Sequence, residues 1–126
     1  MSRLRRLSLF AGGRLPSDEP ELTVRRSSRR PNRLGFAVPA EWRLSVTAYP
    51  GASESDLLET LLHELVHLHI GAVPEAHRWH GATFKRTLAA AMHEAYGVTG
   101  VNPSSIHHGP YAEAIARSRD PQRSLF

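Results

Sequence analysis

Apolar residues recur at helical spacing in the middle of the chain. The stripe consists of Leu57, Leu58, Leu61, Leu62, Leu65 and Val66. Residues three and four apart share one face of an α-helix, so the stripe predicts an amphipathic helix with one buried side. Ser53 and Asp56 suit its first turn as capping residues, and Gly71 is a natural stop. The pattern therefore predicts a core helix over about residues 54–70.

A second stripe with the same spacing follows after a linker at 71–79. Its apolar positions are Phe84, Leu88, Ala91, Met92 and Ala95. Gly97 closes this segment, which predicts a second helix over 81–96. We expect a loop over 98–109 and a short helix over 110–119.

Between residues 21 and 49 the period changes to that of β-strands. Residues 43–49 alternate apolar and polar side chains, as a half-buried strand does. Shorter β-type segments lie at 22–24 and 34–38, and Pro31-Asn32 marks a turn between them. We expect an α+β fold, in which a three-stranded antiparallel meander packs on the two core helices.

The length of 126 residues is enough for one domain with a modest core. Residues 1–20 contain Gly12-Gly13 and Pro16, which predicts a flexible, loosely docked N-terminal arm. Residues 21–100 form the expected core of the domain. Residues 101–126 form the expected C-terminal loop, short helix and tail.

Cysteine is absent from the chain. Disulfides, thiolate nucleophiles, cysteine-based zinc ribbons and iron–sulfur clusters are thereby excluded, and a metal must be held by His, Asp, Glu or water. No apolar run approaches the ~20 residues that a membrane span needs. The basic start is interrupted by Arg5 and Arg6 and does not resemble a signal peptide. We therefore expect a cytoplasmic protein without a membrane partner.

The positive charge of the chain is carried by arginine. The net charge is +4 and the sequence pI about 10.3. Between residues 22 and 40 there is no acid, and this segment contains Arg25, Arg26, Arg29, Arg30 and Arg33. Guanidinium groups match phosphates well, so these arginines are candidates for binding nucleic acid. A solvated basic hairpin without a partner explains them equally well.

The segment HELVH places chemistry on the first predicted helix. His63 and His67 are four residues apart, so both imidazoles lie on one helix face, about one turn of ~5.4 Å apart. Two nitrogens so placed can bind one zinc ion at the usual ~2.0–2.1 Å. Glu64 lies beside them, where it can act as general base on a water molecule. Two partly exposed helix histidines are the alternative without chemistry.

A catalytic zinc needs a third protein ligand. The candidates are His69, Glu75, His77, His80 and His93. His69 points to another face of the first helix, and His93 lies deep in the second helix. Because His80 opens the second helix, where a close approach to the first helix is easiest, geometry favours His80.

These residues carry a resemblance to a known family. HELVH, followed thirteen residues after His67 by HGATFKRTL, resembles the SprT-like zinc metallopeptidases. The resemblance implies a small zincin-like domain with one zinc ion on His63, His67 and His80, and with Glu64 as catalytic base. It also implies a protein substrate, since better-known members act on proteins bound or crosslinked to DNA. The Cys-rich ribbon that some members use toward nucleic acid is missing, so the arginine-rich segment is its candidate substitute.

The last five residues, QRSLF, resemble the peptide that binds the bacterial sliding clamp. Gln122, Leu125 and Phe126 are the candidate contacts, because such peptides bury a Leu-Phe anchor in an apolar pocket. Coincidence is the alternative, since five-residue patterns are common.

The sequence favours a zinc-dependent endopeptidase with a catalytic Glu64. Three other hypotheses stay open. One is a repressor-cleaving peptidase of the ImmA/IrrE-like group, although its further acidic ligand motif is not evident. Another is an arginine-rich nucleic-acid-binding module without catalysis. The last is a family member that binds zinc for stability alone, against which the intact Glu64 argues.

Overall fold

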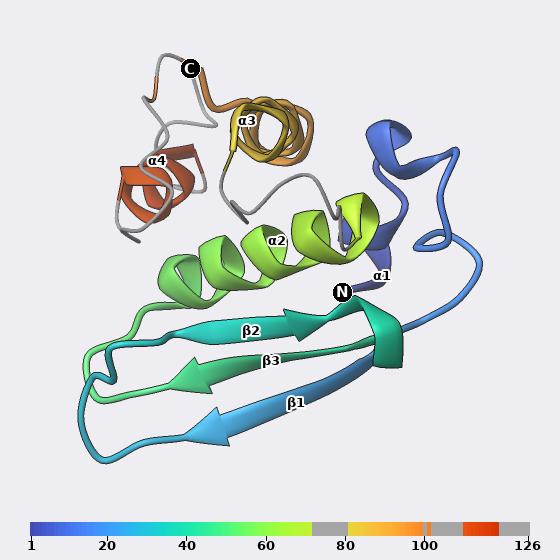
Figure 1. Cartoon of the computed structure of the whole chain (residues 1–126). Coiled ribbons are helices and arrows are strands. Elements are labelled where there is room, and N and C mark those ends of the chain that lie inside the picture. Colours follow the sequence, from blue (N-terminus) through green and yellow to red (C-terminus); the bar gives the residue numbers. More distant parts are fainter. Residues whose placement is uncertain (72–80, 100, 102–109, 119–126) are drawn as a thin grey trace.

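The structure is a computed structural model that describes residues 1–71, 81–99, 101 and 110–118. Its sequence of elements combines a short N-terminal helical segment, a three-stranded sheet and three longer helices (Figure 1). In chain order these are α1 (Ser2–Arg5), η1 (Ser8–Phe10), β1 (Glu21–Arg26), β2 (Gly35–Val38), η2 (Pro39–Glu41), β3 (Arg43–Ala48), α2 (Glu54–Ile70), α3 (Ala82–Tyr96) and α4 (Pro110–Ser118). The expected α+β class is confirmed.

The sheet is mixed, with the strand order β1-β3-β2. β2 pairs antiparallel with β3, but β1 pairs parallel with β3. The predicted antiparallel meander, and with it the arginine-rich hairpin, is therefore wrong. Residues 27–34 can span roughly 25 Å when extended, and stepping over one strand requires only about 10 Å. The connection from β1 to β2 therefore skips one strand position, which β3 later occupies. β3 thus lies at the centre of the sheet, with its residues 44–46 buried.

α2 begins and ends where the sequence predicts. Ser53 and Asp56 form a capping box, in which the Ser53 hydroxyl accepts from the Asp56 N–H and the Asp56 carboxylate accepts from the Ser53 N–H at 2.8 Å. Gly71 ends the helix with φ of 76°, a left-handed value that favours glycine. Both ends are fixed by local chemistry, which explains why sequence patterns find them.

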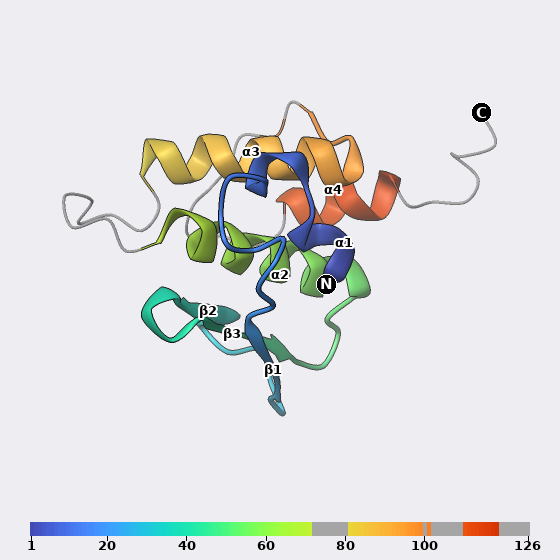
Figure 2. The same cartoon turned by 90° about the vertical axis from the view of Figure 1, so that its right-hand side faces the viewer.

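α2 lies in the middle of three layers. The sheet covers one side of it, and α3 and α4 lie on the other side (Figures 1 and 2). Leu62, Leu65 and Val66 are fully buried. Because both sides of α2 are covered, polar residues on this helix also become buried. That arrangement places the HELVH segment inside the molecule.

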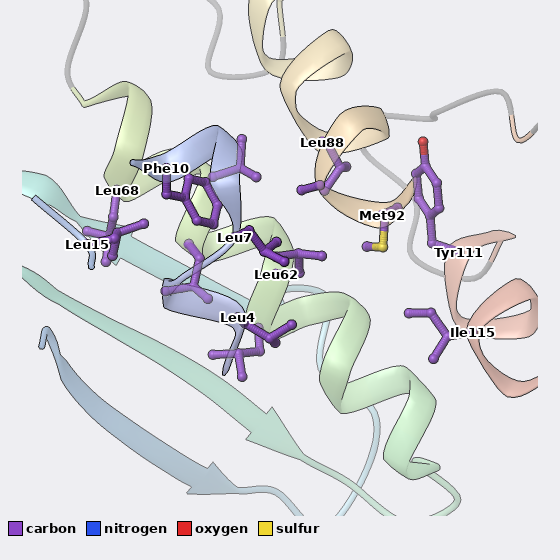
Figure 3. Close-up of a cluster of buried hydrophobic side chains, with 14 of the residues drawn as sticks. Leu4, Leu7, Phe10, Leu15, Leu62, Leu68, Leu88, Met92, Tyr111 and Ile115 are labelled. Atoms are coloured by element: carbon purple, nitrogen blue, oxygen red, sulfur yellow. The ribbon is translucent and has the colours of Figure 1, made fainter. Parts of the chain in front are cut away.

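The N-terminal segment belongs to the core. Leu4, Leu7, Phe10 and Leu15 are at most 5% exposed, and they gather against α2 and α3 (Figure 3). The Ser8 hydroxyl donates to the Glu94 carboxylate of α3 at 2.7 Å. This packing differs from the loosely docked arm that Gly and Pro content indicated. These four apolar side chains recur every three to five residues, and they stabilise docking although the intervening residues favour turns.

Several predicted residues lie outside the part of the chain that the structure describes. These are the third-ligand candidates Glu75, His77 and His80 and the tail residues Gln122, Leu125 and Phe126. Within the described part, none of the helices has the length and hydropathy that a membrane crossing requires.

Candidate metal centre

His63, Glu64 and His67 form a buried group in the middle of α2. One ligand atom from each residue can be chosen so that all three atoms lie within 4.8 Å of one another. The three side chains are 4–7% exposed. Among the described residues, this is the one His, Asp or Glu group with such spacing. The residues therefore form a group that could hold a metal ion, as the helical spacing predicts.

Phe84 of α3 packs against both imidazoles. Its ring is stacked on His67, with centroids 4.2 Å apart and planes at 24°, and it meets His63 at 4.8 Å. The two imidazoles are 5.0 Å apart, edge to face. Phe84 restricts how these rings can turn, and this role was not predicted. The available signal was Phe84 in HGATF, whose position also fits the inner apolar stripe of the second helix.

Glu64 is a carboxylate in an apolar setting. Its Oε2 is buried without a hydrogen-bond partner among the described residues, and its Oε1 lies 3.9 Å from Nε2 of His63. Burial raises the pKa of Glu64 to about 8, against the opposing effect of the positive charge of Arg33. A buried carboxyl group with a free oxygen is well suited to accept a proton.

Strand β2 runs beside this group, and Gly35 allows the close approach. A Cβ built on Gly35 would lie 2.7 Å from the Ser45 carbonyl oxygen, 2.8 Å from Cγ2 of Thr60 and 3.3 Å from Cγ of Glu64. Any side chain here would push β2 away from α2. Because Gly35 has no side chain, the sheet can lie close to Glu64.

The outer edge of β2 is open within the described residues, because the strand pairs with β3 alone. The Thr47 N–H donates to the Leu34 carbonyl at 2.8 Å, just before the strand. Backbone groups alternate sides along an antiparallel ladder, so those of Gly35 and Ala37 point away from β3. The open edge thus presents donors and acceptors close to Glu64.

The five predicted arginines lie on β1 and in the connection that follows it. Arg25 and Arg26 are on β1, while Arg29, Arg30 and Arg33 are in the connection from β1 to β2, and all five are exposed. The Arg33 guanidinium lies 5.3 Å from the Phe36 ring centroid. Arg33 also acts electrostatically on Glu64. The connection therefore carries positive charge from the surface toward the candidate site.

Two further histidines do not join the group. His69 packs against Phe10, with ring centroids 5.0 Å apart, and burial lowers the pKa of His69. His93 is exposed on α3. Of the third-ligand candidates, His69 thus packs against Phe10 on another face of α2, and His93 is exposed to solvent.

Fold and site together define a small α+β domain whose core helix carries a His–Glu–His group able to hold a metal ion. The SprT-like family matches the chain over residues 4–107, and the chain belongs to this family. Membership indicates a hydrolase of the metallopeptidase type. Neither a curated protein nor a solved structure matches the chain.

Proposed function

We propose that the chain is a zinc-dependent endopeptidase. His63 and His67 would hold the ion through their imidazole nitrogens, and His80 is our proposed third ligand. The observation that supports this most strongly is the buried Glu64, whose Oε2 has no hydrogen-bond partner among the described residues. The two imidazoles on one face of α2 fit the preference of zinc for nitrogen donors, and Glu64 lies beside them, where it can act on a water molecule.

The chain's own residues supply the proton transfers. When bound, a zinc ion supplies Lewis acidity that activates water and polarises a peptide carbonyl. Glu64 accepts a proton from the attacking water molecule while the water oxygen bonds to the carbonyl carbon. The carboxyl group then gives that proton to the amine nitrogen as the C–N bond breaks. Phe84 supports these steps by holding the His63 and His67 rings in position.

The open edge of β2 is the proposed substrate-binding strand. The backbone groups of Gly35 and Ala37 can pair with an extended peptide, which adds a strand to the sheet. The scissile bond would then lie near Glu64, because Gly35 brings β2 against this residue. Recognition through the backbone favours unfolded segments of protein over a fixed side-chain sequence.

Replacement of Glu64 tests the function. Glu64→Gln keeps the size and burial of the side chain but removes its ability to accept a proton. We expect unchanged zinc content by elemental analysis, and a rate of β-casein cleavage lower by roughly 10²–10⁴-fold. Glu113→Gln, the same change at a side chain 77% exposed on α4, is the matched control. Full activity of Glu64→Gln would contradict the mechanism.

We further propose nucleic acid as a partner of the connection that contains Arg29, Arg30 and Arg33. Arg30 lies 5.8 Å from the ring centroid of Tyr49, so guanidinium and aromatic groups occur together on this exposed segment. Backbone phosphates attract such groups, and aromatic rings can stack on bases. Charge reversal of all three arginines should abolish binding of single-stranded DNA. Affinity for DNA that does not fall with added salt would contradict the proposal.

The sliding clamp is a proposed protein partner on the basis of the tail pattern alone. Deletion of Leu125 and Phe126 should remove clamp binding, since these two would form the apolar anchor. Arg123→Ala is the matched control within the same pentapeptide. Equal clamp affinity with and without the two residues would exclude the motif.

A further inference from the structure

The outer edge of β1 is open. β1 pairs with β3 on one side, and Figure 1 shows it as the last strand of the sheet within the described residues. The Glu21 N–H donates to Trp42 O at 3.1 Å and the Ser27 N–H to Ala48 O at 2.9 Å. Because backbone groups alternate sides along a strand, those of Leu22, Val24 and Arg26 point toward the open edge.

The same strand carries an exposed apolar side chain. Val24 is 56% exposed, and no other large hydrophobic residue in the described part is exposed. Val24 lies on the same sheet face as Leu22, since the two are separated by one residue. α2 packs on this face mainly over β2 and β3. Leu22 packs partly against the core, whereas Val24 is left exposed. An open strand edge with an exposed valine is a surface that favours pairing with another strand.

The sequence of β1 complements itself in one antiparallel register. With Thr23 opposite Thr23 of a second copy, Leu22 lies opposite Val24 on one sheet face. On the other face Glu21 lies opposite Arg25. The pairs of Leu22 with Val24 are the hydrogen-bonded ones, as the outward-pointing backbone groups require. By the two-fold symmetry each pair occurs twice, which is the pattern of an isologous interface.

Neighbouring registers fit less well. The next register with the same backbone pairing places Arg25 opposite Thr23 and Leu22 opposite Arg26. In that register Val24 lies opposite Val24, so one apolar pair remains in place of two, but both Glu21–Arg25 pairs are lost. Directly opposite charges and apolar neighbours stabilise a pair of strands, whereas mismatched pairs do not. The register centred on Thr23 is thus selected by side-chain chemistry.

We propose that β1 pairs antiparallel with β1 of a second copy of this chain, and that the two three-stranded sheets join into one. Two-fold symmetry places the Glu21–Arg25 pairs at both ends of the contact. It covers Val24 with Leu22 of the second copy. This interface lies on the opposite sheet edge from β2, so it leaves the proposed substrate strand open.

Charge exchange between two variants tests the interface. Glu21→Arg and Arg25→Glu each place like charges opposite one another in a homodimer. We expect each to lower the dimer association constant by about tenfold or more. In an equimolar mixture, the reversed charges are again opposite, and a heterodimer should form with nearly the wild-type association constant. Sedimentation equilibrium over a concentration series measures all of these masses.

The controls separate this contact from general charge effects. Arg86→Glu makes the same charge change at an exposed position of α3 and should dimerise as the wild type does. Val24→Lys should weaken the dimer without changing the unfolding temperature of the monomer. A wild-type chain that stays monomeric at every concentration would overturn the proposal, whatever the variants do. So would single reversal variants that dimerise normally, or a mixture that does not associate.

Discussion

Glu64 of α2 lies against Gly35 of β2, with its Cγ 3.3 Å from the place where a side chain on Gly35 would begin. The candidate base therefore lies close to the strand whose outer edge is open. Their contact joins two elements that are far apart in the sequence. A methyl group at Gly35 would therefore change the position of β2 relative to the metal group.

Gly35→Ala should destabilise the fold. The new methyl group would lie 2.7 Å from the Ser45 backbone oxygen and 2.8 Å from Thr60, so β2 must shift. Overpacking of this kind costs about 1–3 kcal/mol of unfolding free energy, which denaturant titration measures. Gly12→Ala is the matched control, because nothing lies within 4 Å of its Cβ position. Equal unfolding midpoints for the two variants would show that β2 does not need this close approach.

Metal binding should depend on the α2 histidines. His63→Ala and His67→Ala should each lose zinc, because each removes one of two nitrogen donors on the same helix face. His93→Ala, at an exposed position, should keep one zinc per chain by elemental analysis. For the wild type, free zinc at about 100 times its Kd should raise the unfolding free energy by roughly 2.7 kcal/mol. Zinc content that is unchanged in His63→Ala would exclude the proposed centre.

Removal of the Phe10 side chain should destabilise the whole domain. Phe10 is fully buried, although it lies in a segment that contains little regular structure. Phe10→Ala should therefore cost about 3–5 kcal/mol through lost burial and the cavity left behind. Arg6→Ala, an exposed residue of the same segment, should unfold close to the wild type. If both variants had wild-type stability, the N-terminal segment would not contribute to the core.

The contact between Glu94 and Ser8 should make stability depend on pH in the acid range. Hydrogen bonds from the Ser8 backbone N–H and hydroxyl, with one from the Leu9 N–H, hold the pKa of Glu94 below its usual 4.5. A carboxylate with a lowered folded-state pKa stabilises the fold above its unfolded pKa. That stabilisation is lost as pH falls through the folded-state pKa.

Urea titrations of the wild type and Glu94→Gln measure this effect. Their difference in unfolding free energy should be constant near neutral pH and should shrink below pH 4.5. Glu19→Gln, an exposed carboxylate elsewhere in the N-terminal segment, should follow the wild-type profile. A difference that grows on acidification would contradict the assigned role of Glu94.

The sequence by itself determined the features that local interactions fix. α2 runs over Glu54–Ile70 as predicted, because its apolar period, its capping box and Gly71 all lie within the segment. His63, Glu64 and His67 lie together for the same reason, since one turn of helix brings residues four apart to the same face. A pattern that depends on neighbouring residues is already present in the unfolded chain.

Only the tertiary structure decided which distant segments meet. Strand patterns located β1, β2 and β3, but alternation does not specify a neighbour, and the buried β3 took the centre of the sheet. Likewise, Phe84 contacts His67, and Gly35 lies close to Glu64, because α3 and β2 pack on α2. Such contacts depend on how the whole core fills its volume, so no local pattern contains them.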